Sequence, residues 1–296
     1  MSSAGFCFLR GGTMNIQVMI GGIRLGFDSD FEIEIEESLT PFLCTEESNC
    51  DVNVKITYNE TKVVKPQAQM SGEDILLEHY HQEGQRVCLA KGGIRGYLAT
   101  TVCDEKLSTL ECQLHFRAEE SARTLGTLLR LIPMCGILQQ KEALFFHASQ
   151  IEMDKKGVLF TASSGTGKTT QAKLWRSYRG AKIICNDRTV IRAGKTYGYP
   201  VDGSEPVISG TVLPLGAIVL LGQDKENRVR RLSPKEALIK LFPQLIIETW
   251  NEQSRILAVE QLITYVSKYP VYLLECTPDE RAVVCLEQQL KMDGVI

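Results

Sequence analysis

One stretch decides the fold: Val158-Leu159-Phe160-Thr161-Ala162-Ser163-Ser164-Gly165-Thr166-Gly167-Lys168-Thr169. Its first four residues are typical of a short buried strand, and the rest fits the P-loop pattern, in which glycines let backbone N–H groups approach a phosphate. Ala162 stands where the pattern has glycine, a change from one small residue to another. Apolar residues at helical spacing follow, and Gly180 supplies a C-terminal stop. Strand, loop and helix therefore come in the order that a nucleotide-binding loop requires.

The loop carries residues suited to the phosphates of ATP or GTP and to a divalent cation. Lys168 would reach the β and γ phosphates, and the Thr169 hydroxyl would bind Mg²⁺ at the positive end of the helix. The predicted nucleotide-binding residues are Ser163, Ser164, Gly165, Thr166, Gly167, Lys168, Thr169 and Thr170. The alternative is a surface turn that matches the pattern by chance, but the strand before it and the helix after it favour nucleotide binding.

Length and charge narrow the class of protein. The chain has 296 residues, 44% of them hydrophobic, which is enough for two domains or one large domain with a substantial core. A net charge of -3 predicts neither nucleic acid nor a membrane as a partner. From Lys168 to Lys195 there are eight basic residues and one acid, Asp187, so this segment would attract a polyphosphate.

The cysteines and histidines show no metal-binding spacing. The ten cysteines include no C-x-x-C pair, and the four histidines fall at no recognisable distance from them. We find no apolar run long enough for a membrane span and no secretory signal, so reduced cysteines in the cytoplasm are expected. The sequence leaves a homo-oligomer open.

The chain divides into a β-rich half and an α/β half. Residues 1–13 are expected to be a disordered tail, residues 14–118 a β-rich region, and residues 119–296 a P-loop domain. Strands are predicted near residues 16–20, 31–35, 52–58, 86–89 and 97–102. A single helix is predicted within residues 118–140 despite Pro133.

The second half alternates strands and helices. Strands are predicted at residues 181–185, 189–191, 215–221 and 271–276, and a helix at residues 254–266. Ser233 and Thr277 each precede Pro and are followed three residues later by Glu, which predicts a helix start with a capping box at both.

Asp187 is the second chemical element. A right-handed crossover through the P-loop helix would place the strand of residues 182–185 in the same sheet as the P-loop strand. Asn186 and Asp187 would then lie at the edge where the phosphates bind. There a carboxylate could bind Mg²⁺ or take the proton from an attacking hydroxyl, and the sequence leaves both roles open, beside that of a turn residue.

Together these residues resemble the catalytic domain of the HPr kinase/phosphorylase family, clearly over residues 147–192. The matching motifs are His147-Ala148-Ser149, the P-loop and the strand that ends in Asn186-Asp187. The resemblance implies a core akin to phosphoenolpyruvate carboxykinase, here joined to a β-rich N-terminal half, and serine phosphorylation that uses ATP and Mg²⁺. By position it implies His147, Lys168 and Asp187 as catalytic residues and Thr169 and Asp187 as metal ligands.

The sequence also departs from that family. Asn186 replaces the first residue of the family's Asp pair, so either the nucleotide and Thr169 complete the metal shell or catalysis is weakened. The family's Glu-containing signature is missing, and the loop of residues 199–205, with two acids, is more typical of a turn. These departures argue against HPr as the substrate, and the chain looks closer to the HPr-kinase-like proteins associated with modified-peptide biosynthesis.

Three functions follow from these observations. The first is a kinase that uses ATP and Mg²⁺ to phosphorylate a Ser or Thr hydroxyl of a protein or peptide. The second is a nucleotide-binding regulatory or peptide-docking protein with little or no catalysis, which Asn186 favours. Carboxykinase activity on a small acid is disfavoured, because no companion cluster of metal ligands is recognisable and the chain is short for that class.

Overall fold

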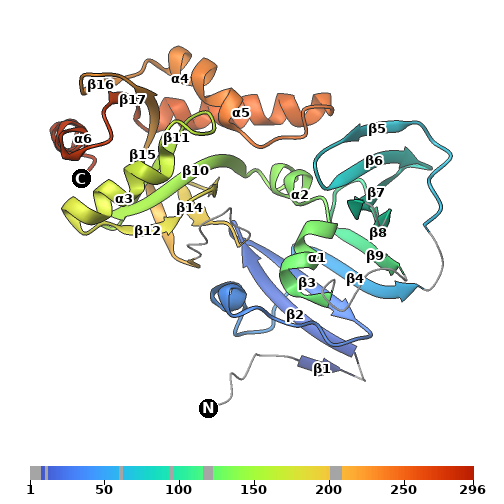
Figure 1. Cartoon of the computed structure of the whole chain (residues 1–296). Coiled ribbons are helices and arrows are strands. Elements are labelled where there is room, and N and C mark those ends of the chain that lie inside the picture. Colours follow the sequence, from blue (N-terminus) through green and yellow to red (C-terminus); the bar gives the residue numbers. More distant parts are fainter. Residues whose placement is uncertain (1–7, 11–12, 60–62, 94–95, 116–122, 201–208) are drawn as a thin grey trace. The chain divides into compact units, whose positions relative to one another are not determined.

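The computed structural model describes residues 8–10, 13–59, 63–93, 96–115, 123–200 and 209–296 (Figure 1). Contacts between residues divide the chain into two compact units. The first consists of Met1–Lys141 with Glu248–Ser254, and the second of Glu142–Ile247 with Arg255–Ile296. The predicted mixed α/β class is confirmed. The predicted junction after residue 118 lies outside the described residues.

The described strands of the first unit form one nine-stranded sheet, ordered β1-β2-β3-β4-β9-β8-β7-β6-β5. Their bounds are β1 (Phe8–Arg10), β2 (Thr13–Ile20), β3 (Ile23–Ser29), β4 (Val52–Asn59), β5 (Met70–Glu73), β6 (Leu77–Gln82), β7 (Gln85–Lys91), β8 (Tyr97–Cys103) and β9 (Thr109–His115). Gly21 and Gly22 both have positive φ, which is what the two-residue turn between β2 and β3 requires. The sheet is mixed, because β4 runs parallel to β3 and β9 while the other neighbours are antiparallel.

One face of this sheet is apolar and covered. In β4, Val52, Val54 and Ile56 are buried and alternate with more exposed residues, the period expected of a strand with one face in the core. Two short helices, α1 (Leu125–Leu131) and α2 (Met134–Gln140), belong to the same unit, and α1 contacts β7 and β8. The Thr101 hydroxyl donates to the Leu131 carbonyl at 2.9 Å and so ties β8 to α1.

Three expectations for this half need correction. Residues 31–35 form no strand of their own: their backbone makes a single bridge, from Glu34 to Thr124. The helix within residues 118–140 is two helices, because Pro133 lacks an N–H and forces extended geometry on Ile132 before it. The expected tail lies mostly outside the described residues, but its described residues are in strands: Phe8–Arg10 forms β1, which pairs with β2, and Thr13 begins β2.

The second unit is built on two long strands that each belong to two sets of strands. Its described strands are β10 (Leu144–Met153), β11 (Lys156–Thr161), β12 (Lys182–Cys185), β13 (Arg188–Arg192), β14 (Lys195–Gly198), β15 (Val212–Gln223), β16 (Arg228–Arg231) and β17 (Val271–Cys276). The first residues of β10 pair with β13, and its later residues pair with β11 on one side and β12 on the other. Similarly, β15 pairs with β14 near its start and with β11 and β17 further on.

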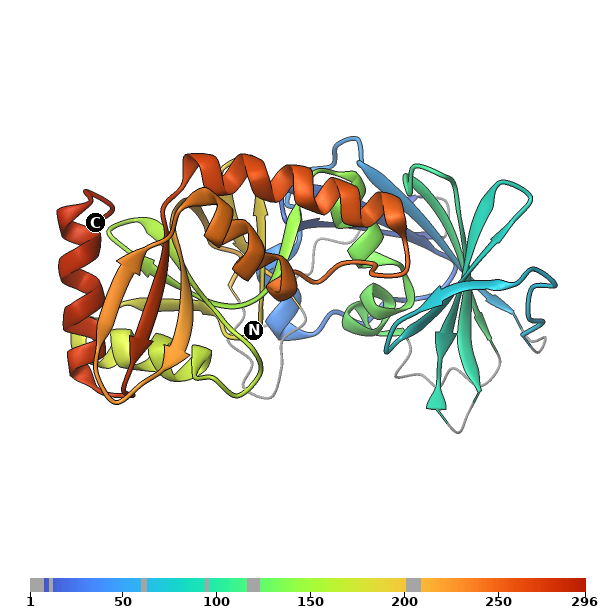
Figure 2. The same ribbon diagram turned by 90° about the horizontal axis from the view of Figure 1, so that it is seen from above.

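Helices cover both faces of the sheet that contains β11, β15 and β17 (Figure 2). The helices of this part are α3 (Lys168–Arg179), α4 (Pro234–Leu241), α5 (Glu252–Lys268) and α6 (Glu280–Met292). Leu159 of β11 packs in the core formed with α4 and α5, whereas Val158 and Phe160 pack in the core formed with α3 and α6. A strand buried on both faces explains why residues 158–161 are continuously apolar up to Thr161.

One of the two predicted capping boxes is present. Ser233 caps α4, with its hydroxyl accepting from the Glu236 N–H and the Glu236 carboxylate accepting from the Ser233 N–H. At α6 the cap is Asp279 and not Thr277, because the Thr277 hydroxyl donates to Asp279, whose other carboxylate oxygen accepts from the Arg281 N–H. Among the described residues, no helix is long and apolar enough to cross a membrane.

Candidate functional site

The P-loop joins β11 to α3 at the C-terminal end of β11. Gly165 and Gly167 have φ values of 78° and 118°, in the left-handed region that favours glycine, and Gly167 is the N-cap of α3. The first intrahelical bond runs from the Gln171 N–H to the Gly167 carbonyl. The backbone N–H groups at the start of α3, ahead of Gln171, are therefore not used in the hydrogen bonds of the helix itself. Such groups are the donors that the N-terminus of an α-helix offers to an anion.

Lys168 is folded against this loop. Its Nζ donates to the carbonyls of Ala162 at 3.0 Å and Ser163 at 3.4 Å, and the residue is only 7% exposed. Burial lowers the pKa of the ammonium group, and the charge of Asp187 opposes this. The charges of Lys168 and Asp187, two of the residues predicted as catalytic, therefore influence each other across the site.

Asp187 is held by the neighbouring strand β10. Asn186 and Asp187 link β12 to β13, the Ser149 hydroxyl donates to the Asn186 carbonyl at 2.8 Å, and the Ala148 N–H donates to the Asp187 carbonyl at 3.0 Å. Since β10 lies antiparallel to both β11 and β12, those two strands are parallel and end at the same edge. This is the relation that the crossover argument predicted for the P-loop and Asp187.

The Asp187 carboxylate has two cationic or proton-donating neighbours. His147 Nε2 lies 2.9 Å from Oδ1, and Arg188 Nε lies 3.4 Å from Oδ2. The hydrogen bond with His147 is the main cause that lowers the pKa of Asp187, with smaller contributions from the charges of His147, Arg188 and Lys168, while burial opposes the shift. An ionised carboxylate can only accept, so with Asp187 ionised the donor of this hydrogen bond is Nε2 of His147.

The remaining predicted residues are spread around this edge. Ser163, Ser164, Gly165 and Thr170 are exposed on the loop and the first turn of α3, and Thr166, Gly167 and Thr169 are half-buried. Asn186, the neighbour of Asp187, is 7% exposed and therefore largely buried. Most of the acidic loop of residues 199–205 lies outside the described residues.

The sequence reasoning missed Gln171. It lies one turn into α3, is 3% exposed, and its Nε2 donates to Cys276 Sγ at 3.2 Å. The signal was a polar residue on the helix face that also carries Ala172 and Trp175, both fully buried.

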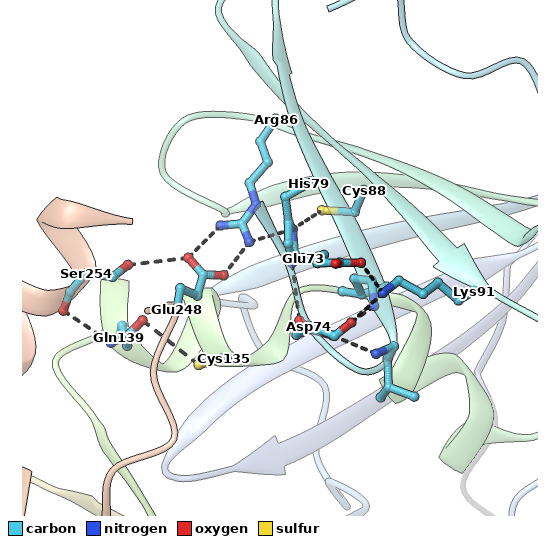
Figure 3. A network of polar contacts seen from close by, with 12 residues as sticks. Glu73, Asp74, His79, Arg86, Cys88, Lys91, Cys135, Gln139, Glu248 and Ser254 are labelled. Atoms are coloured by element: carbon cyan, nitrogen blue, oxygen red, sulfur yellow. Dashed lines mark hydrogen bonds and ion pairs between the residues drawn. The ribbon is translucent and has the colours of Figure 1, made fainter. Parts of the chain in front are cut away.

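The first unit holds a separate buried polar cluster (Figure 3). Arg86 and Glu248 form a two-bonded ion pair in which both side chains are at most 7% exposed. Arg86 also contacts His79 Nδ1 at 3.0 Å, His79 Nε2 contacts Asp74 at 3.2 Å, and Cys88 Sγ lies 3.3 Å from His79 Nδ1. Cys88 and His79 are fully buried, so the centre of this cluster lies in the interior of the unit.

The same cluster explains why Glu248–Ser254 belongs to the first unit. Trp250 stacks on His79 with ring centroids 4.9 Å apart, and the Arg86 guanidinium lies 5.2 Å from the Trp250 ring centre. A side chain at Gly72 would collide with the Trp250 ring, which is the physical reason for glycine there. No local pattern could have revealed these contacts, since Arg86 and Glu248 are 162 residues apart in sequence.

Comparisons with known proteins give a family and a weak likeness to solved structures. The family model described as SynChlorMet cassette protein ScmC matches residues 110–291. Among solved structures, the chain is similar to the Hpr(Ser) kinase/phosphatase from Coxiella burnetii, with 14% identity over 51% of this chain and 99% of that chain and a TM-score of 0.28. That score is too low to establish a shared fold, so the phosphoenolpyruvate carboxykinase-like core stays a prediction. No curated protein matches the chain.

Proposed function

The chain belongs to the SynChlorMet cassette protein ScmC family, and we propose that it is a kinase that transfers the γ-phosphoryl group of ATP or GTP to a Ser or Thr hydroxyl of a protein or peptide. One observation carries the proposal: the P-loop and the Asp187–His147 pair lie at the same edge of one sheet. Phosphoryl transfer depends on positioning and on stabilisation of charge, which a phosphate cradle and a residue that binds the metal or orients the nucleophile can supply.

The residues present fit a triphosphate and Mg²⁺. Left-handed glycines, the free end of α3 and a buried lysine provide backbone donors and a positive charge. The Thr169 hydroxyl and the Asp187 carboxylate would hold Mg²⁺, which would neutralise charge that develops on the phosphate oxygens. Lys168 would exchange its two carbonyl contacts for phosphate oxygens, and the buried ammonium would thereby gain a full counter-charge.

The pKa of Asp187 bears on which role it takes. A general base works best with a pKa near the working pH, and the pKa of this carboxyl is held below its usual range by His147. Binding a cation suits such a carboxylate better. In the transfer step the acceptor oxygen bonds to the γ-phosphorus, the bond from that phosphorus to the bridging oxygen breaks so that the nucleoside diphosphate leaves, and the hydroxyl proton passes to the Asp187–His147 pair.

A second function is favoured by a specific observation. Both oxygens of Asp187 already have partners, at 2.9 Å in His147 and 3.4 Å in Arg188, and Asn186 supplies no second carboxylate. A site of this kind could bind a nucleotide and signal its presence, or dock a peptide, without catalysis.

Binding and turnover separate these functions. Calorimetry with Mg-ATP and Mg-GTP measures binding, and transfer of labelled γ-phosphate to peptides encoded beside the gene measures catalysis. We expect Lys168→Ala to abolish binding and transfer, because it removes the buried positive charge, while Lys235→Ala on the exposed surface of α4 changes neither. Asp187→Asn should keep ATP affinity within a few-fold and reduce turnover by about 10²-fold or more.

Each result has a distinct meaning. Nucleotide binding by the wild type without transfer to any peptide would favour the regulatory function. Equal turnover in wild type and Asp187→Asn would remove Asp187 from the mechanism. Absence of binding of both nucleotides to the wild type would overturn both proposals.

A further inference from the structure

A cavity of about 450 Å³ adjoins the P-loop on the side of β15 and β17. It is lined by residues of the loop and of α3, by Gln223 at the end of β15 with Asp224 after it, and by Cys276 at the end of β17 with Pro278 beyond it. We propose that this cavity binds the nucleoside of the nucleotide, with the Gln171 side-chain carbonyl accepting a hydrogen bond from it. The inference rests on the proposed nucleotide binding at the P-loop, and it adds where the rest of the ligand lies and which side chain reads it.

The order of the strands sets the direction of the ligand. Along the sheet the strands run β12, β10, β11, β15, β17, and the P-loop follows β11. Asp187 follows β12, on one side of the loop, whereas the cavity lies at the ends of β15 and β17, on the other. A triphosphate whose γ end faces Asp187 therefore presents its nucleoside end to the cavity.

Gln171 provides an independent reason to expect a ligand. The residue lines the cavity and is only 3% exposed. Its Nε2 donates to Cys276 Sγ. Its Oε1 has no hydrogen-bond partner among the described residues. A buried carbonyl without a partner destabilises a protein by about 1–3 kcal/mol, which an N–H or O–H donor of a bound nucleoside would relieve.

The walls suit a nucleoside. The volume of about 450 Å³ falls within the range of roughly 300–1,000 Å³ that small-molecule sites have. Leu221 and Pro278 supply apolar surface for a base, and Cys276 stays protonated because burial raises its pKa to about 11. Gln223 Nε2 donates to the Thr166 carbonyl at 3.4 Å, so the cavity wall and the phosphate loop are joined directly.

The test compares ATP with inorganic tripolyphosphate, which has the phosphates and lacks the nucleoside. Calorimetric titrations with Mg²⁺ present are run on the full chain, on Gln171→Leu, on Pro278→Trp and on the control Gln289→Leu. Gln171→Leu removes the acceptor at nearly constant volume, and Pro278→Trp fills the cavity from an exposed position. Gln289 lies on α6 and pairs with Asp293, outside the cavity.

We expect the wild type and the control to bind ATP at least tenfold more tightly than tripolyphosphate. Gln171→Leu and Pro278→Trp should lose at least fivefold in ATP affinity and keep the wild-type affinity for tripolyphosphate, which also shows that they are folded. Equal affinity of the wild type for both ligands, or unchanged ATP affinity in both variants, would overturn the inference and leave the proposed function standing. If neither ligand binds the wild type, the proposed function fails and this inference fails with it.

Discussion

At the scale of single residues, Asp187 is the most constrained group of the candidate site. Its backbone carbonyl is fixed by β10, one carboxylate oxygen faces His147 and the other faces Arg188. A side chain held in this way has a defined position before a ligand binds, which is what orientation of a cation or of an imidazole requires.

This arrangement predicts how the pKa of Asp187 responds to mutation. His147→Gln removes the largest cause that lowers it, so the pKa should rise toward the usual value of about 4. Carbon-detected NMR titration of the Asp187 carboxyl measures this directly. His81→Gln, at an exposed histidine of the first unit, should leave it unchanged. An Asp187 pKa that is the same in His147→Gln and wild type would contradict the assigned role of His147.

The same shift has a consequence for stability. A carboxyl whose pKa is lower in the folded than in the unfolded state stabilises the fold above its unfolded pKa, and this contribution is lost as the pH falls through its folded pKa. The stability advantage of wild type over Asp187→Asn should therefore be largest near neutral pH and decrease below a pH of about 4. Urea unfolding of both proteins at pH 7 and pH 3 tests the sign, and an advantage that grows at acidic pH would refute it.

At the scale of elements, the start of α4 shows a local signal that the sequence predicted correctly. The Ser233 hydroxyl accepts from the Glu236 N–H at 3.3 Å, and the Glu236 carboxylate accepts from the Ser233 N–H at 3.0 Å. Ser233→Ala should lower the free energy of unfolding by about 1 kcal/mol, since it leaves a donor of the first turn without its cap. Thermal or urea unfolding measures this.

A matched variant separates capping from loss of a hydroxyl. Ser177 lies within α3 and is exposed, so Ser177→Ala should be neutral or slightly stabilising, because alanine has the higher helix propensity. Similar losses in both variants would show that the capping box contributes little.

Elements with local patterns could be predicted from sequence, and elements defined by pairing could not. β4, β7, β8, β15 and β17 follow apolar or alternating runs, and the P-loop motif located β11 and α3. β10 escaped because Ser149 and Gln150 are polar and yet fully buried: their side chains bond to the Asn186 carbonyl and to Thr196. β5 and β6, at one edge of their sheet, are mostly polar and are specified by their neighbours.

The candidate site divides in the same way. The P-loop and Asp187 could be predicted from the sequence, because the motif locates the loop and the right-handed crossover rule locates the strand that ends before Asp187. The role of His147 came only through a family resemblance, and its contact with Asp187 depends on the register that pairs His147 with Arg188 across β10 and β13. The contact of Gln171 with Cys276, the last residue of β17, depends on the tertiary fold and could not be predicted from the sequence.

At the scale of the whole chain, the polypeptide passes between the two units more than once. The chain leaves the first unit after Lys141, returns for Glu248–Ser254 and leaves again. The returning segment supplies Glu248 to Arg86 and Trp250 to His79. A fragment that ends at Lys141 would therefore contain a buried arginine without its counter-charge.

The ion pair within the first unit predicts a strong coupling in stability. Glu248→Gln should lower the free energy of unfolding by about 3–5 kcal/mol, because it leaves the buried Arg86 charge uncompensated. The double variant Arg86→Met/Glu248→Met should lose less than the sum of the single variants, since no buried charge remains. Urea unfolding of the full double-mutant cycle gives the coupling energy.

An exposed pair serves as the control. Lys291 and Glu287 form a surface pair on α6, and Lys291→Met should change stability by no more than about 0.5 kcal/mol. Additive losses at Arg86 and Glu248 would show that the two charges do not depend on each other.

Strand β10 forms hydrogen bonds with both parts of the candidate site, the P-loop side and Asp187. The His147 carbonyl accepts from the Thr161 hydroxyl just before the P-loop, and the next residue, Ala148, donates to the Asp187 carbonyl. Two consecutive residues of β10 thus fix the strand that leads into the P-loop and the backbone of Asp187. Consecutive residues of a strand are separated by a rise of about 3.3 Å. Because both bonds come from backbone groups of consecutive residues, the geometry of β10 itself sets the spacing between the loop and the aspartate.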